Sequence, residues 1–302
     1  MRVSARRVCC AGLGVTAWAC GPPAPGERAG SARESVDTTF RAPRRVTIRG
    51  YAGDAMEPFV TRDGRFLLFN SRNDPRVNTD VHYARAVDAL TFEYAGPVRG
   101  INTAALEGVP TLDRDGTMYF VSTRSYAGTL STVYRGRYAA GTVDHVALVA
   151  GLPRRRGEVI FDVEVSADGT ALYYAGGTFR GGPVPESADL AIAVRRGDAF
   201  EPRAQSAALL ANVNTPTALD YAAAVSGDAL ELFFTRTRGE RPAIYRAVRR
   251  AVGEPFAVAG RLVAIEGFAE APALAPDGRS LYYHARVGDS FAIFRVTRAR
   301  SR

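Results

Sequence analysis

Acidic side chains recur at a regular distance before an aspartate turn, and they are the residues best suited to chemistry in this chain of 302 residues. Each of five turn aspartates is preceded, six to nine residues upstream, by at least one acid. Carboxylates that converge on one point could hold Ca²⁺ or Mg²⁺, attract a cationic ligand, or serve as the acid and base of a hydrolase. The six candidates for ligand or metal binding are Asp54, Glu57, Glu107, Asp162, Asp220 and Glu270.

A repeated phrase indicates the elements that would position these acids. It first occurs as PFVTRDGRFLLFNSR from Pro58, and later copies place the turn aspartates 52, 53, 60 and 49 residues apart. Asp-Gly favours a hairpin turn because Gly accepts positive φ and Asp can bond its own backbone. Two apolar or aromatic residues lie five and six positions after each turn aspartate. The structural turn residues are Asp63, Asp115, Asp168, Asp228 and Asp277.

The segment after each hairpin predicts further strands. A third strand follows in every copy, as in PAIYRAVRR after Asp228, and a weaker fourth strand follows in most copies. Four strands in a repeated unit of roughly 50 residues are typical of a β-propeller. We therefore predict an all-β fold, a single five-bladed propeller domain over residues 38–302, with six blades as the alternative.

The N-terminal strand is predicted to close the ring. The fifth copy ends after its third strand, which would leave an unpaired sheet edge. The segment TTFRAPRRVTIRG, residues 38–50, matches LTFEYAGPVRG, with Phe40 aligned to Phe92 and Val46 to Val98. We expect this segment to complete the last blade.

The phrase P-x-x-x-x-D-G-x-x-L/F-Y/F-x-S-R resembles the WD-repeat-like "PD" repeat of the TolB family and of the propeller domains of prolyl-oligopeptidase-type enzymes. Three of the five copies retain both the Pro and the Asp-Gly, and the resemblance covers roughly residues 38–300. It implies a propeller alone. We expect neither the N-terminal α/β domain of TolB nor a hydrolase domain, because the sequence contains no G-x-S-x-G nucleophile motif.

A propeller would bring the acids together, because the segments that enter its innermost strands surround one mouth of the central channel. The resulting ring of carboxylates could bind Ca²⁺ or Mg²⁺, although the sequence does not define a metal. The alternative is that the acids cap loops or pair with neighbouring arginines, with Glu164 pointing elsewhere. The aromatic residues close in sequence that could serve as sugar platforms are Tyr51, Phe161, Tyr221 and Phe268.

Other chemistry finds little support in the sequence. His82, His145 and His284 are far apart, and we interpret His82 and His284 as packing or surface residues. No H-E-x-x-H, EF-hand or P-loop motif is present. The net charge of +8 comes from scattered arginines rather than a basic stripe with interleaved aromatics, so we expect no nucleic-acid partner.

The N-terminus predicts export. MRVSARR precedes an apolar run from Val8 to Ala19, which suits a signal peptide over residues 1–19 but is too short to span a membrane. Cys20 follows directly, as in bacterial lipoprotein signals, and residues 20–37 form a Pro-, Gly- and Ser-rich tether. The other cysteines, Cys9 and Cys10, lie in the signal segment, which excludes a disulfide scaffold.

These observations lead to one functional hypothesis. We expect a monomeric, non-catalytic binding or scaffold propeller, with no cofactor beyond the ion considered above, which recognises an envelope protein or a glycan. It would be anchored through lipid at Cys20 on the periplasmic side of the outer membrane, or secreted if Cys20 is not lipidated. The insertion from Thr178 to Asp189 is the candidate partner-facing loop. The alternative function is a glycoside hydrolase or lactonase-like enzyme that uses the channel-mouth carboxylates.

Overall fold

A computed structural model describes residues 35–73, 78–180 and 184–299. The predicted signal segment, Cys20 and most of the predicted tether lie outside these residues. Val36 and Asp37, at the end of that tether, form strand β1. No helix in the described part of the chain is long and apolar enough to cross a membrane.

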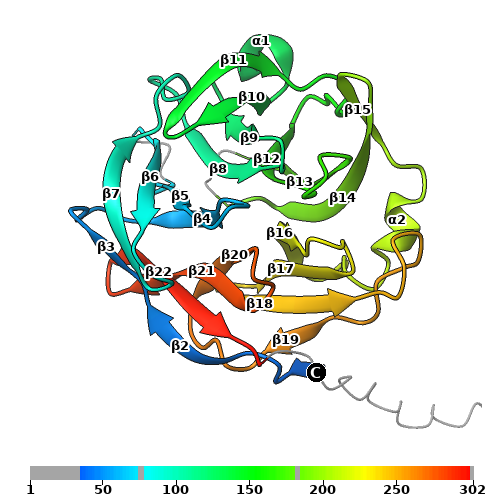
Figure 1. Ribbon diagram of the computed structural model, residues 1–302. Coiled ribbons are helices and arrows are strands. Elements are labelled where there is room, and N and C mark those ends of the chain that lie inside the picture. Colours follow the sequence, from blue (N-terminus) through cyan, green and yellow to red (C-terminus); the bar gives the residue numbers. More distant parts are fainter. Residues whose placement is uncertain (1–34, 74–77, 181–183, 300–302) are drawn as a thin grey trace, which may run out of the picture. The chain divides into compact units, whose positions relative to one another are not determined.

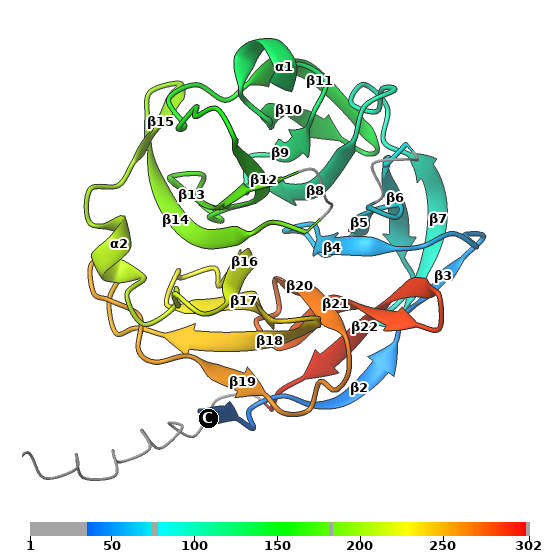
Figure 2. The same cartoon turned by 180° about the vertical axis from the view of Figure 1, so that it is seen from behind.

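The described residues form five β-sheets arranged as a ring around a central axis, which confirms the predicted five-bladed propeller (Figures 1 and 2). In each blade the first strand of the repeated unit (β4, β8, β12, β16 or β20) lies nearest the axis. Only two short helices, α1 (Tyr126–Thr129) and α2 (Ser206–Leu209), interrupt the strands among the described residues.

The blades follow one another along the chain. Blade 1 contains β4 (Met56–Val60), β5 (Phe66–Asn70), β6 (Val81–Ala86) and β7 (Thr91–Pro97); blade 2 contains β8 (Glu107–Leu112), β9 (Thr117–Ser122), β10 (Val133–Ala139) and β11 (Thr142–Leu148). Blade 3 contains β12 (Glu158–Val165), β13 (Ala171–Thr178), β14 (Ser187–Arg196) and β15 (Ala199–Pro202). Blade 4 contains β16 (Leu219–Val225), β17 (Glu231–Arg238), β18 (Arg241–Val248) and β19 (Gly260–Leu262), and blade 5 contains β20 (Ala269–Leu274), β21 (Ser280–Val287) and β22 (Ser290–Thr297).

The N-terminal segment closes the ring, as the sequence predicted. Strand β2 (Arg41–Arg45) pairs antiparallel with β22 and supplies the outer strand of blade 5. The same segment also adds β1 in parallel to blade 4 and β3 (Thr47–Arg49) in parallel to blade 1. Because one continuous segment pairs with three blades, it ties the start of the ring to its end.

The hydrophobic core lies between neighbouring blades rather than within them. Side chains alternate across each second strand, so the two residues that follow each turn pack against different neighbours. Tyr283, for example, belongs to the cluster shared with blade 4, and Tyr282 belongs to the cluster shared with blade 1. Five such clusters fill the five spaces between blades.

The hairpin turns show one departure from the repeat. Asp63, Asp168, Asp228 and Asp277 each accept a backbone amide two residues later through Oδ1. In blade 2 the turn is one residue shorter, and Asp113 accepts the amides of Asp115 and Thr117 instead. Asp115 therefore lies in the predicted turn, but Asp113 makes its stabilising hydrogen bonds.

Candidate functional site

The six candidate acids occupy four different positions relative to their turns. Glu57 and Asp162 lie six residues before their turn aspartates, Glu270 lies seven before, Glu107 and Asp220 lie eight before, and Asp54 lies nine before. The first strands of these blades break register near these positions, so the offsets send the acids to different surroundings.

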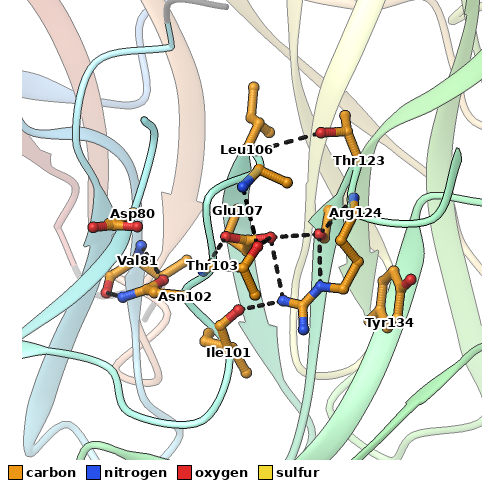
Figure 3. Close-up of polar contacts among 12 residues, drawn as sticks. Asp80, Val81, Ile101, Asn102, Thr103, Leu106, Glu107, Thr123, Arg124 and Tyr134 are labelled. Carbon is orange, nitrogen blue, oxygen red and sulfur yellow. Dashed lines mark hydrogen bonds and ion pairs between the residues drawn. The ribbon is translucent and has the colours of Figure 1, made fainter. Parts of the chain in front are cut away.

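Glu107 and Asp220 form buried ion pairs within their own blades. Glu107 is fully buried and lies 3.2 Å from Arg124 Nη2, and it accepts hydrogen bonds from Ser122 Oγ and from the backbone and hydroxyl of Thr103 (Figure 3).

Asp220 is equally buried and repeats this arrangement with Arg236 Nε at 2.7 Å and the backbone amide of Thr215 at 2.8 Å. The arginines are fixed as well, since Arg124 lies over the ring of Tyr134 and Arg236 over that of Tyr245. These two acids hold the entry loops of blades 2 and 4 in place.

Asp54 joins two blades. Its Oδ2 lies 2.6 Å from Arg72 Nε, and its Oδ1 accepts the amide of Phe291 at 2.7 Å. Asp54 therefore connects the loop that enters blade 1 to the third strand of blade 5.

The other three acids meet at the channel, where we define the mouth cluster as Glu57, Asp162, Tyr221, Glu270 and His284. The Glu57 carboxylate is electrostatically coupled to Asp162 and Glu270, and the Asp162 carboxylate is also coupled to Glu270. Strands β4, β12, β16, β20 and β21 supply these side chains from blades 1, 3, 4 and 5.

Hydrogen bonds organise the mouth cluster. The Glu57 amide donates to His284 Nδ1 at 3.3 Å, so the Nε2 of the neutral imidazole carries the proton and faces Glu270 Oε2 at 3.2 Å. The Tyr221 hydroxyl donates to the second oxygen of Glu270. His284 is fully buried, and it thus joins Glu57 and Glu270 across two blades.

Backbone geometry directs Glu57 toward the axis. Its φ of 49° lies in the left-handed region, at a break in the register between β4 and β5. Val109, Ala222 and Ala271 adopt similar φ values at the equivalent position of other blades. A bulge of this kind redirects a side chain and is common beside functional sites.

The surroundings raise the pKa values of the mouth carboxyls. Burial is the main cause for Glu57, whose pKa rises to about 8 with help from Asp162 and Glu270, although His284 opposes the shift. Burial also raises the pKa of Asp162 to about 8, and Glu164 and Glu270 add to the shift. Burial lowers the pKa of His284, but the hydrogen bond to Glu270 and the negative charges nearby outweigh it and leave the pKa raised.

The channel is narrow below the mouth cluster. Glu57, Asp162 and Glu164 line a cavity of about 30 Å³, which has room for one or two water molecules. Farther along, Arg62 reaches across from blade 1 and pairs with Glu164 at 3.2 Å, and it also donates to the carbonyl of Val165 at 2.9 Å. A ligand larger than water must therefore bind above the cavity, at the mouth.

Two groups of half-buried aromatic rings flank the mouth cluster. Phe161 contacts Phe179 and Tyr221 with ring centroids 5.5 and 5.8 Å apart. On the other side, Phe291 contacts Phe268 and His284, each at 5.7 Å.

Three of the four aromatic residues considered from sequence therefore lie beside the mouth cluster. Tyr51 lies instead beside Asp54, to whose carbonyl its hydroxyl donates, and it packs in blade 1 against Phe69, His82 and Tyr94.

His284 and the insertion in blade 3 differ in how the structure places them. His284, interpreted from sequence as a packing or surface residue, is fully buried against Phe291, and it also accepts the amide of Glu57 and faces the carboxyl group of Glu270. The insertion from Thr178 to Asp189 is partly strand, since β13 ends at Thr178 and β14 begins at Ser187, and residues 181–183 lie outside the described residues. The described residues contain no group of three or more His, Cys, Asp or Glu side chains arranged to hold a metal ion.

Solved structures with the same fold include glycoside hydrolases and TolB. A family 117 glycoside hydrolase from Zobellia galactanivorans matches with a TM-score of 0.53 and 11% identity, over 87% of this chain and 91% of that one. A thermostable family 43 glycoside hydrolase matches with a TM-score of 0.52 and 11% identity, over 84% and 91%. TolB from Acinetobacter baumannii matches with a TM-score of 0.46 and 14% identity over 82% of this chain, which spans 55% of the TolB chain.

Sequence comparisons do not assign the chain to a family. No family model matches the chain, and no curated protein matches it. At 11% identity the likenesses to the two glycoside hydrolases show the propeller fold and nothing finer.

Proposed function

We propose that the protein binds a saccharide at the mouth of its channel and acts as an exported recognition module of the bacterial envelope. One observation carries the proposal. Glu57, Asp162 and Glu270 converge without an arginine partner among the described residues, whereas Glu107 and Asp220 each have one.

The contrast matters because burying carboxyl groups together is unfavourable. Removing a charge from water costs several kcal/mol unless a counter-charge compensates it. Blades 2 and 4 provide that compensation with Arg124 and Arg236, and the mouth cluster contains only His284. Clusters that lower stability and perturb pKa values are more common at functional sites than elsewhere.

The side chains around the mouth support a saccharide as the ligand. Binding sites for small molecules combine aromatic surfaces with a few directed polar groups. Here the rings around Phe161 and Phe291 lie on either side of carboxyl, imidazole and phenol groups that can donate and accept hydrogen bonds. Hydroxyl groups on a sugar ring are suited to such mixed donors and acceptors.

The cellular setting of the proposal comes from the sequence. The signal segment, the tether and Cys20 support export and lipid anchoring on the periplasmic side, and secretion follows if Cys20 is not lipidated. A protein partner at the Thr178–Asp189 insertion, a monomeric state and an ion in the channel remain part of the proposal.

Hydrolysis is the second candidate function, and the raised pKa values favour it. A carboxyl with a pKa of about 8 is mostly protonated at pH 7 and can donate a proton to a leaving group. Two of the solved structures with this fold are named as glycoside hydrolases of families 43 and 117. In this reading Glu57 or Asp162 would act as the acid, with Glu270 positioned by Tyr221 and His284.

Titration calorimetry against a panel of neutral oligosaccharides tests the binding proposal. We expect Glu57→Gln and Asp162→Asn each to weaken binding about tenfold, since a buried polar group left without its hydrogen-bond partner costs about 1–3 kcal/mol. Glu201→Gln, an exposed change of the same type on β15, is the matched control. Equal affinity in the wild type and all three variants would refute the assignment of the mouth, and release of reducing sugar by the wild type alone would identify hydrolysis.

A further inference from the structure

A second hollow lies beside the mouth, between blades 4 and 5, and arginines dominate its lining. It has a volume of about 560 Å³ and extends from the turn between β17 and β18 to the loop before β20 and the end of β21. We call it the arginine groove. Its charged residues are Arg236, Arg238, Glu240, Arg241, Arg261 and Arg286.

The charges of the arginine groove are unbalanced. Arg236 is committed to Asp220 at 2.7 Å. Arg241, Arg261 and Arg286 also line the groove, and Glu240 is the one carboxylate in its lining within the described residues. A concave surface with one dominant sign of charge concentrates ligands of the opposite sign.

One arginine that lines the groove carries a buried donor without a partner. The Nε–H of Arg261 is buried and has no hydrogen-bond partner in the described part of the chain. A buried donor without an acceptor costs about 1–3 kcal/mol, so an arrangement that keeps one favours an incoming acceptor. The planar guanidinium group matches the paired oxygens of carboxylate, sulfate and phosphate groups.

The floor of the groove is rigid. Arg236 lies over the rings of Phe234 and Tyr245 at 5.3 and 4.8 Å, and those rings stack on each other at 5.8 Å. Because Asp220 also fixes Arg236, this side of the groove needs little reorganisation to accept a ligand.

The groove and the mouth share one wall. Phe268 lines the groove, its ring contacts Phe291 at 5.7 Å, and Phe291 contacts His284 of the mouth cluster at the same distance. Two aromatic rings therefore separate the arginines from the carboxyl groups. One extended ligand could contact both regions.

We propose that the arginine groove binds an oxyanion substituent of a saccharide whose uncharged part lies at the mouth. The ligand class is thus an acidic saccharide that carries sulfate, carboxylate or phosphate groups. This inference rests on the proposed saccharide function and specifies its ligand. The raised pKa values of Glu57 and Asp162 are consistent with it, because protonated carboxyls do not repel an anion.

Calorimetry with matched oligosaccharides tests the inference. The probes are one neutral oligosaccharide and its sulfated, uronate-containing and phosphorylated counterparts, together with a single-stranded oligonucleotide of equal charge. The groove variant is Arg241→Gln with Arg286→Gln, both at exposed side chains. The control variant is Arg154→Gln with Arg156→Gln, which removes the same charge from an exposed loop between blades 2 and 3.

We expect at least one acidic saccharide to bind about tenfold more tightly than the neutral one. The groove variant should lose that advantage, and the control variant should keep it. Equal losses in both variants, no preference for an acidic saccharide, or equal binding of the oligonucleotide would each overturn the inference. Failure of the neutral saccharide to respond to Glu57→Gln would instead refute the proposed role of the mouth, so the two failures are distinguishable.

Discussion

Stability of the propeller should decrease as the pH rises through neutrality, because of the mouth carboxyls. Glu57 and Asp162 have ordinary pKa values of 4.5 and 3.8, and both rise to about 8 in the folded protein. Between these limits the folded state holds protons that the unfolded state has released. Each group then lowers the free energy of unfolding by about 1.4 kcal/mol per pH unit at most.

Several effects reduce that slope. The two carboxyls are coupled to each other, and the folded state can relax around a charge. We therefore expect a combined loss of about 2–4 kcal/mol between pH 5.5 and pH 8.5. His284 acts in the same direction, since its raised pKa gives stability at low pH that is lost as the pH rises through that value.

Urea unfolding at pH 5.5, 7.0 and 8.5 measures the effect. Glu57→Gln with Asp162→Asn removes both titrations and should give a flatter profile that crosses that of the wild type, with the variant more stable at pH 8.5. Glu201→Gln with Glu254→Gln removes two exposed acids and should leave the profile unchanged. Parallel profiles for the wild type and the mouth variant would refute the reasoning that these carboxyls are protonated in the folded state.

Three further predictions concern stability. Phe40 is 1% exposed and packs edge-on against Phe233, so Phe40→Ala should lower the unfolding free energy by about 3–5 kcal/mol in denaturant titrations. A loss below about 1 kcal/mol would contradict the role of the N-terminal segment in ring closure. Glu107→Ala should lower the unfolding free energy by about 3–5 kcal/mol because it leaves Arg124 unpaired. Adding Arg124→Met should recover part of that loss in the same assay, and no recovery would argue against the ion pair. Ala229 has a φ of 57°, a left-handed conformation that strains an alanine, at the turn position where the other blades have Gly. Ala229→Gly should therefore raise the unfolding free energy by about 1 kcal/mol, and a decrease would contradict this backbone strain.

The fold was predictable because its information is local. Asp-Gly turns and alternating side chains are visible within a single strand pair, and the spacing of the copies is visible by comparing one copy with the next. Ring closure was predictable for a similar reason, since Phe40 and Val46 repeat a pattern present in blade 1. The additional pairing of β1 and β3 was not, because strands of two or three residues carry too little pattern to be recognised.

The site was harder to predict because the sequence search used a window rather than a position. A window of six to nine residues ignores the break in register within the first strands, so it grouped Glu57, which lies at such a break, with loop-facing Glu107. The pairing of strands would have identified His284 as a neighbour of Glu270. Residues equally distant from a hairpin turn tend to face each other, and Glu270 and His284 each lie seven residues from Asp277 and are ladder partners.

Divergence among the five copies explains why the acids of the entry segments have different surroundings in different blades. Blades 2 and 4 retain an arginine that neutralises the acid of the entry loop, so those acids contribute order. Blades 1, 3 and 5 place an acid closer to the turn, where the strand directs it toward the axis. A fivefold repeat therefore produces an asymmetric mouth, and the arginine groove lies beside blade 5, which supplies both Glu270 and His284. A ligand that bridges the two regions would be oriented by that asymmetry, with its anionic end toward blades 4 and 5.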